Sequence, residues 1–191
     1  MSVSRLRSGL GAVALACSLV AAPGVGLATA AETAAPAAAP IAQTAAPTQA
    51  APALAVTKLT HAQAASRFNS SGITWSSTGG CSDRNTPTCT SFSQINLATV
   101  QGAQTLKSAS GCAVHITGGT ETGHAGGTYS HWNGYKLDFR PTSCLSGYIT
   151  GAFTYIGERG DGAALYKAAS GNIYARESNH WDVTFYNCGG C

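Results

Sequence analysis

Four side chains in two short segments could together bind a metal ion and move a proton. In residues 130–138, SHWNGYKLD, His131 stands seven positions before Asp138, and Gly134 permits the chain to turn between them. In residues 177–180, ESNH, a carboxylate precedes a histidine by three positions. Catalytic zinc sites use three protein ligands, commonly histidine and carboxylate, and leave a fourth position for water. These segments therefore predict a zinc site.

Each of the four side chains has a role in such a site. His131, Asp138 and His180 are the predicted zinc ligands. Glu177 is the predicted general base, which takes a proton from water and delivers it to the leaving amine of a cleaved peptide bond. Asp182, two positions after His180, could orient a ligand imidazole, although an exposed strand carboxylate is the simpler interpretation. The predicted chemistry is metal-assisted peptide hydrolysis.

Predicted strands surround these residues. Residues 112–117 alternate, with Val114 and Ile116 on one face, and the glycines that follow end the strand. Residues 135–139 alternate in the same way and include Asp138. The other predicted strands cover residues 164–168 and 173–177, joined as a hairpin through Ser170-Gly171-Asn172, and residues 180–186.

Two segments have helical periodicity. Ser91 and Gln94 form a capping-box pattern ahead of apolar residues at helical spacing, which predicts a helix over residues 91–107. Residues 145–153 have similar spacing, although they include two glycines. Together the elements predict an α+β domain with a small antiparallel sheet backed by helices.

The two segments resemble the signature of the LAS zinc peptidases. This family contains D-alanyl-D-alanine dipeptidases and carboxypeptidases and phage L-alanyl-D-glutamate endopeptidases, and hedgehog signalling domains share its fold. The likeness lies in Ser-His-x-x-Gly-x-x-x-Asp followed by Glu-x-x-His and covers about residues 112–185. The resemblance implies that His131, Asp138 and His180 bind zinc and that Glu177 is the base. It also implies the same fold and a substrate among the peptides of peptidoglycan.

One turn departs from that signature. Many members that cleave wall peptides have a serine-glycine-tyrosine-arginine turn whose arginine holds the substrate, whereas residues 118–121 read Gly-Gly-Thr-Glu. Glu121 would suit an ammonium group of the substrate or could bond backbone amides. His124, Arg140 and Arg176 are candidates for the missing electrophilic role, and His124 could instead make a structural loop hydrogen bond. Glu121 and His124 are thus the candidate substrate-binding residues, and an endopeptidase is favoured over a carboxypeptidase.

The chain is organised in three parts. Residues 1–30 combine Arg5 and Arg7 with an apolar stretch and a small-x-small cleavage site, which predicts a signal peptide. Residues 31–56 are rich in alanine and proline and predict a disordered segment. Residues 57–191 have the composition of one compact domain, the predicted zinc peptidase domain. No segment is long and apolar enough for stable membrane insertion.

The predicted domain carries an even number of cysteines, which in an exported protein predicts three disulfides. Local spacing favours Cys81 with Cys89 and Cys188 with Cys191, which leaves Cys112 with Cys144. A cysteine zinc site is the weaker interpretation, because the C-terminal Cys-Gly-Gly-Cys has no second pair to complete a tetrahedron.

Charge excludes one class of partner. Loss of Arg5 and Arg7 with the signal peptide lowers the net charge of +3 by two, and the rest of the chain lacks basic runs. Such a surface has no electrostatic footprint for nucleic acid. We expect a monomer that is secreted, either free or associated with the cell wall.

The leading interpretation is a secreted zinc metallopeptidase acting on peptidoglycan stem or cross-link peptides. A zinc-stabilised, disulfide-rich binding module is the first alternative, and such a module would not require Glu177. A disulfide-stapled inhibitor or adhesion domain is the second, and it would contain no stoichiometric zinc.

Overall fold

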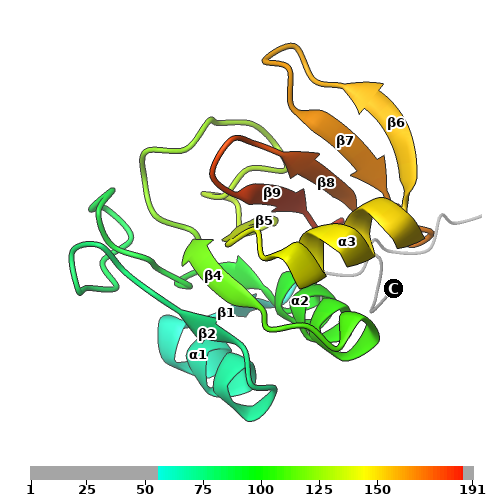
Figure 1. The fold of residues 1–191 in the computed structure, drawn as a ribbon. Coiled ribbons are helices and arrows are strands. Elements are labelled where there is room, and N and C mark those ends of the chain that lie inside the picture. The colour runs from blue at the N-terminus through cyan, green and yellow to red at the C-terminus, as the bar shows by residue number, and fades with distance from the viewer. Residues whose placement is uncertain (1–55, 187–191) are drawn as a thin grey trace, which may run out of the picture. The chain divides into compact units, whose positions relative to one another are not determined.

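The computed structural model describes residues 56–186, which form a mixed α+β fold (Figure 1). The predicted signal peptide and nearly all of the predicted disordered segment lie outside the described residues. Within residues 56–186, no helix has the length and apolar character needed to cross a membrane. The helices are α1 (His61–Ser70), α2 (Leu97–Ser110) and α3 (Ser143–Ala152). The strands are β1 (Lys58–Leu59), β2 (Thr74–Trp75), β3 (Ile95–Asn96), β4 (His115–Gly118), β5 (Lys136–Phe139), β6 (Thr154–Glu158), β7 (Ala164–Lys167), β8 (Ile173–Arg176) and β9 (Trp181–Thr184).

Seven strands form one sheet in the order β2-β4-β5-β9-β8-β7-β6, while β1 and β3 form a separate antiparallel pair. The expectation of a small antiparallel sheet is therefore wrong in size, and the β2–β4 pair is parallel. The sequence did not predict β6 because nearly all of its residues are exposed, so it lacks the alternation of a half-buried strand. Strand β2 has only two residues and depends on its pairing with β4.

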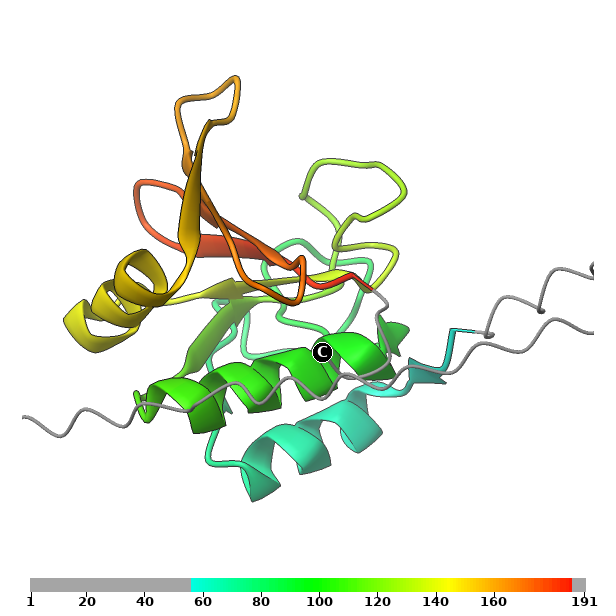
Figure 2. The same cartoon turned by 90° about the vertical axis from the view of Figure 1, so that its right-hand side faces the viewer.

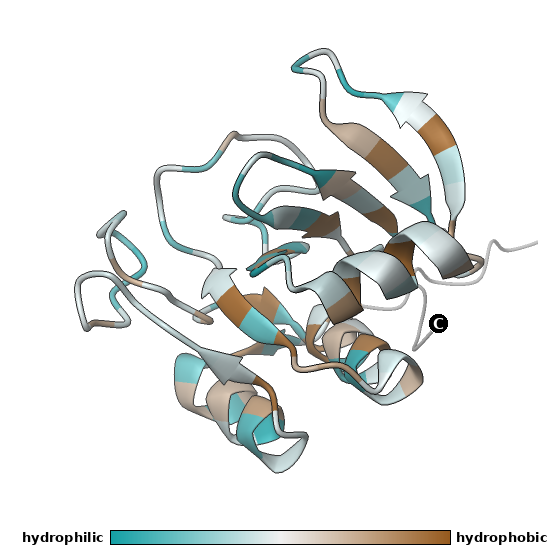
Figure 3. Cartoon of the chain, viewed as in Figure 1, coloured by the Kyte–Doolittle hydropathy of each residue, from teal (hydrophilic) through white to brown (hydrophobic). Residues whose placement is uncertain are grey.

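The two faces of the central strands differ in chemistry. Leu137 of β5 lies opposite Val183 of β9, and both side chains are buried in the hydrophobic core. Asp138 points to the other face, because successive residues of a strand alternate. Helices α1 and α2 lie together on one side of the sheet, and the loop between β4 and β5 rises on the other (Figure 2). The alternation of hydrophobic and hydrophilic residues is visible along β4 in Figure 3.

Helix α2 begins later than the sequence predicts. The predicted start at Ser91 is wrong, because Gln94 has a left-handed backbone with φ of 65° and Ile95–Asn96 pair with β1. The Ser91 hydroxyl instead accepts a hydrogen bond from the amide of Ser93. A capping-box pattern therefore marks a local turn here, and the helix starts only after the short β3 strand.

Helix α1 was not predicted, although a capping box opens it. Thr60 Oγ1 accepts a hydrogen bond from the Gln63 amide, and Gln63 Oε1 accepts one from the Thr60 amide. The helix buries Ala64 and Phe68 in the core. Its alanine-rich start resembles the low-complexity segment before it, and this hides the boundary in the sequence.

Several predicted elements are present. The helical spacing over residues 145–153 corresponds to α3, and the predicted hairpin is the β7–β8 pair. The disulfides Cys81–Cys89 and Cys112–Cys144 are formed, and the second joins the segment after α2 to the first turn of α3. The predicted Cys188–Cys191 pair lies outside the described residues.

Candidate metal centre

The carboxylate of Asp138, on β5, is the point at which the candidate ligands meet. This side chain is 8% exposed. Gly118 of β4 lies opposite it, and a Cβ atom at Gly118 would lie only 2.3 Å from Asp138 Oδ2. Gly134 has a φ of +76°, and its amide donates to the carbonyl of His131 at 2.8 Å. A glycine therefore does turn the chain between His131 and Asp138, as the sequence predicts.

His131 is held with one ring nitrogen turned toward Asp138. Its Nδ1 lies 2.6 Å from the carbonyl oxygen of Gly119, an acceptor, so this nitrogen carries the hydrogen of the neutral ring. Its Nε2 lies 3.3 Å from Asp138 Oδ1. The ring is buried, so its orientation is fixed by the protein rather than by solvent. A histidine that donates from one nitrogen to a carbonyl and presents the other is arranged as metal ligands are.

His180 approaches the same carboxylate oxygen from the loop between β8 and β9. Its Nε2 lies 3.4 Å from Asp138 Oδ1, and its Nδ1 lies 2.7 Å from Asn179 Oδ1. The two predicted histidine ligands thus both face one oxygen atom of the third predicted ligand, although His180 is more than 40 residues from Asp138 in the sequence.

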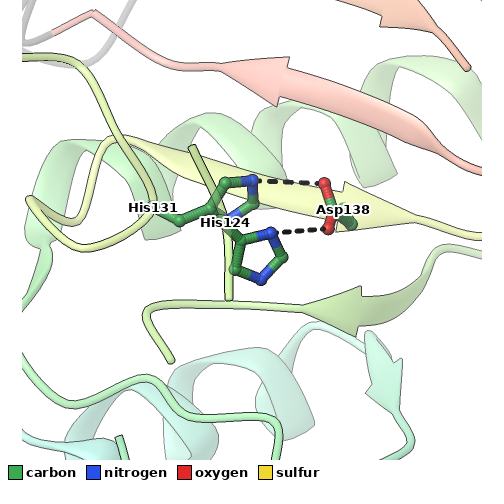
Figure 4. A group of neighbouring side chains, drawn as sticks. All are labelled: His124, His131 and Asp138. Carbon is green, nitrogen blue, oxygen red and sulfur yellow. Dashed lines mark ion pairs between the residues drawn. The ribbon is translucent and has the colours of Figure 1, made fainter. Parts of the chain in front are cut away.

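His124 is a fourth candidate ligand. Figure 4 shows its ring beside that of His131, with both turned toward Asp138. The ring centroids are 3.8 Å apart, and His124 Nδ1 lies 3.7 Å from Asp138 Oδ2. Its Nε2 lies 3.3 Å from Glu121 Oε1. A carboxylate behind a histidine is again a metal-site arrangement.

Glu121 is buried and engaged within the protein. Its carboxylate accepts hydrogen bonds from the amides of Ser91 and Gly119 at 2.7 and 2.9 Å. Burial raises the pKa of Glu121, but His124 and these amides lower it more, so the pKa lies below its ordinary value. Two roles were considered for Glu121, binding an ammonium group of the substrate and bonding backbone amides. The hydrogen bonds of its carboxylate correspond to the second.

His124, His131 and Asp138 form a group that could hold a metal ion, since one ligand atom of each lies within 4.8 Å of the others. Asp138 Oδ1 is buried and accepts no hydrogen bond within residues 56–186. A tetrahedral ion with bonds of about 2.1 Å sets its ligand atoms about 3.4 Å apart. The separations of 3.3 and 3.4 Å from Asp138 Oδ1 to His131 and His180 match that spacing. The group of His124, His131 and Asp138, called the cluster below, therefore fits a bound cation, whereas His180 faces the same Asp138 oxygen but is not a member of that group.

Asp182 is buried, so the interpretation of an exposed strand carboxylate is wrong. It lies directly opposite Asp138 across β5 and β9, where both strands are covered. Its Oδ1 lies 3.6 Å from His131 Nε2, and its Oδ2 accepts a hydrogen bond from Lys136 Nζ at 2.6 Å. Burial raises the pKa of Asp182, but His131 and Lys136 lower it well below its ordinary value. Asp182 is therefore ionised beside the cluster.

The carboxylates control the charge of His131. Burial lowers the pKa of His131, but Asp138 and Asp182 raise it more, to about 9. In the absence of a bound cation, His131 is therefore protonated at neutral pH, and its charge partly compensates the two facing carboxylates.

Glu177 lies in the loop after β8, beside His180. Its Oε2 is 3.3 Å from His180 Nε2, and its Oε1 accepts a hydrogen bond from Arg159. Arg159 follows β6 and also donates to Asp182 Oδ2 at 2.9 Å. Nothing in the sequence singles out Arg159, since no motif surrounds it and β6 itself was not predicted.

The other two candidates for the electrophilic role lie elsewhere. Arg140 is exposed at the end of β5 and is not among the residues that line the cleft around His124, His131 and Asp138. Arg176 donates to the backbone carbonyls of Glu177 and His180, and its guanidinium lies 5.6 Å from the ring centroid of Trp181. Of the three candidates, His124 is the one that lies in the cluster.

A cleft of about 560 Å³ surrounds the cluster. Its lining includes the four candidate ligands and Glu177, together with Lys136, Arg159, Asp161 and Asp182. A second hollow of about 620 Å³ shares Asp161 and Glu177 with it. The two hollows therefore adjoin at Glu177.

Comparisons with protein-family models, curated proteins and solved structures gave no match to this chain. The likeness to the LAS zinc peptidases accordingly rests on the two short segments.

Proposed function

We propose that this chain is an exported zinc metallopeptidase that hydrolyses peptide bonds in peptidoglycan stem or cross-link peptides. The observation that carries the proposal is the position of Glu177. One oxygen of this half-buried carboxylate faces a candidate ligand, His180, at 3.3 Å, and the residue lines the cleft. A site that only binds a metal does not require a general base, and Glu177 is placed where a base would act.

Zinc is the metal that the donors favour. Two or three imidazoles with one carboxylate are a usual ligand set for catalytic zinc, and imidazole suits zinc better than it suits magnesium or calcium. In the proposed site, His131 Nε2, Asp138 Oδ1 and His180 Nε2 would hold the ion. When bound, zinc supplies a Lewis acid that polarises a peptide carbonyl and acidifies water.

Glu177 transfers the proton in the proposed reaction. Glu177 Oε2 accepts a proton from the attacking water, whose oxygen bonds to the carbonyl carbon of the substrate. As the carbon–nitrogen bond breaks, Glu177 returns that proton to the leaving amine. The products are one carboxylic acid and one amine, which then ionise in water, and Glu177 is again ionised for the next cycle. The His124 ring stacks on that of His131, so it lies close enough to the proposed zinc ligands to contact the substrate carbonyl.

The shape of the surroundings supports an endopeptidase. An endopeptidase must accommodate chain on both sides of the bond that it cleaves. The cleft around the cluster and the second hollow meet at Glu177, so space is available on either side of the proposed base. The choice of wall peptides depends on the likeness to LAS peptidases and on predicted export, with which the two disulfides are consistent.

A zinc-stabilised binding module is the second candidate function. The position of His124 beside the other candidate ligands favours it. With His124 as a ligand, the site would have four protein donors, as structural zinc sites do, and no position for water.

Mass spectrometry of zinc-loaded protein incubated with muropeptides, and separately with casein, tests the proposal. We expect new fragments from muropeptides and none from casein. Cleavage of casein would contradict the substrate class, since it would indicate a general protease. No product from either substrate, with zinc bound at one ion per chain, would favour the binding module.

A further inference from the structure

Arg159 reaches the candidate site from the outer end of the sheet. It follows β6, and the turn that joins β6 to β7 is closed by two backbone hydrogen bonds, from Arg159 to Ala163 at 2.9 Å and from Gly162 to Arg159 at 2.8 Å. This turn fixes the backbone from which the side chain extends. Arg159 thereby connects the edge hairpin of the sheet to the cleft.

The Arg159 guanidinium contacts three carboxylates. Nε and Nη2 donate to the two oxygens of Asp161 at 3.0 and 2.7 Å, Nη1 donates to Asp182 Oδ2 at 2.9 Å, and Nη2 also donates to Glu177 Oε1. Together these contacts use the planar, forked donor set of arginine, of which a lysine ammonium could keep only a part.

Arg159 contacts one of the two carboxylate oxygens of Glu177 and one of the two of Asp182. Arg159 binds Oε1 of Glu177 and leaves Oε2 facing His180 Nε2 at 3.3 Å. It binds Oδ2 of Asp182 and leaves Oδ1 facing His131 Nε2 at 3.6 Å. In both residues the oxygen farther from the cluster is held, and the nearer one is turned to a histidine.

Glu177 depends on this contact more than the other two carboxylates do. Asp182 Oδ2 keeps a second donor, Lys136, at 2.6 Å. The side chain of Asp161 is 52% exposed and can be solvated by water. Within the part of the chain that the structure describes, Arg159 is the hydrogen-bond donor to the Glu177 side chain.

We propose that Arg159 is a positioning residue that holds Glu177 with Oε2 presented to the metal centre, and that Asp161 locks the guanidinium in the required orientation. The inference rests on the proposed function, because it assigns Arg159 to the base of that reaction. Arg159 is not a substrate clamp, since its donors already serve protein carboxylates.

Crystal structures of the zinc-loaded wild type, Arg159→Met and Arg159→Lys test the inference without any substrate. We expect Glu177 to leave His180 in Arg159→Met and to stay near it in Arg159→Lys. Zinc should remain at one ion per chain in all three, because the ligands are intact. Arg67→Met, an exposed arginine on α1, is the matched control. An unmoved Glu177 in Arg159→Met overturns the inference whether or not the protein is a peptidase.

Kinetics give the second test. Arg159→Met should lower kcat by about 10–100-fold with KM nearly unchanged, as loss of a supporting partner does, and Arg159→Lys should recover part of the loss. Added to Glu177→Ala, Arg159→Met should produce no further loss, because the two residues act as one unit. An increase in KM with kcat retained would assign Arg159 to the substrate and overturn the inference. A wild type that cleaves no wall peptide defeats the proposed function instead, and the crystal structures still decide the role of Arg159.

Discussion

Asp138 of β5 and Asp182 of β9 lie directly opposite one another, and Oδ1 of each is buried without a hydrogen bond within residues 56–186. Like charges at facing positions of antiparallel strands are destabilising. Lys136 and Arg159 compensate Asp182 through its other oxygen. Within residues 56–186, the ion pairs of Asp138 are all with histidines, which gives a cation bound there a clear electrostatic benefit.

This pair provides a matched test of the metal centre. Asp138→Asn should lose stoichiometric zinc, because a neutral amide is a poor ligand for zinc and the negative charge of the carboxylate that His131 and His180 face is lost. Asp182→Asn should keep one zinc per chain with an affinity lower by about 10–100-fold, as expected for an outer partner. Zinc content after dialysis and competition with a chelator measure both. Equal zinc binding by Asp138→Asn and wild type would rule out Asp138 as a ligand.

Glu177→Gln should separate metal binding from chemistry. The amide cannot accept the proton, so hydrolysis of a wall peptide should fall by about 10²–10⁴-fold, while zinc stays at one ion per chain. The measurement is the initial rate on a fragment identified by the muropeptide experiment. Full hydrolytic rate in this variant would exclude Glu177 as the base.

The metal-free protein should lose stability as the pH rises. The pKa of His131 is raised in the folded protein from an ordinary value of 6.5 to about 9. Its contribution is therefore complete below about pH 6.5 and disappears as the pH passes about 9, a loss on the order of 3 kcal/mol. Urea unfolding in the presence of a chelator measures the change.

His131→Gln is the control for this pH dependence, because its side chain does not titrate and the slope should flatten. Zinc affinity should change in the opposite direction and rise over the same interval, since the ligand imidazole must lose its proton. A metal-free wild type whose stability does not change between about pH 6 and pH 9 would contradict the charge assigned to His131.

Gly118→Ala should disturb the metal centre from the neighbouring strand. A methyl group there would lie 2.3 Å from Asp138 Oδ2 in the present geometry, so the carboxylate must move. We expect weaker zinc binding and a loss of stability of about 1–3 kcal/mol, typical of overpacking. Gly147→Ala is the control, since nothing lies within 4 Å of a Cβ at that position. Unchanged zinc affinity in Gly118→Ala would show that Asp138 can shift without consequence.

The Cys112–Cys144 disulfide should support the fold and not the site. It closes a separation of 32 residues, for which loop entropy predicts a contribution of about 3–4 kcal/mol. Replacing both cysteines with serine should lower the free energy of unfolding by that order and leave one zinc per chain. Loss of zinc from the folded variant would instead link the disulfide to the metal centre.

Local patterns were sufficient for the elements whose residues alternate between a buried and a polar face. Strand β5 could be predicted because Leu137 and Phe139 flank Asp138, and the turn before it because Gly134 separates the two ligands. Strand β6 could not be predicted in this way, since Tyr155 and Ile156 are exposed and the position of the strand is set by its pairing with β7. The prediction for the start of α2 was wrong because the pairing of β3 with β1 overrides a local capping pattern.

The sequence by itself determined the residue types of the candidate site, because histidines and carboxylates are the usual ligands and bases of catalytic zinc sites and stand here at spacings that a strand and a turn can present. It could not determine which of them meet. Asp182 becomes part of the site only because β5 and β9 pair in a register that sets it opposite Asp138. Arg159 does so only because the edge hairpin brings a side chain 18 residues from Glu177 within hydrogen-bonding distance. Such contacts join distant parts of the chain, so they arise from strand pairing and packing and leave no short-range pattern in the sequence.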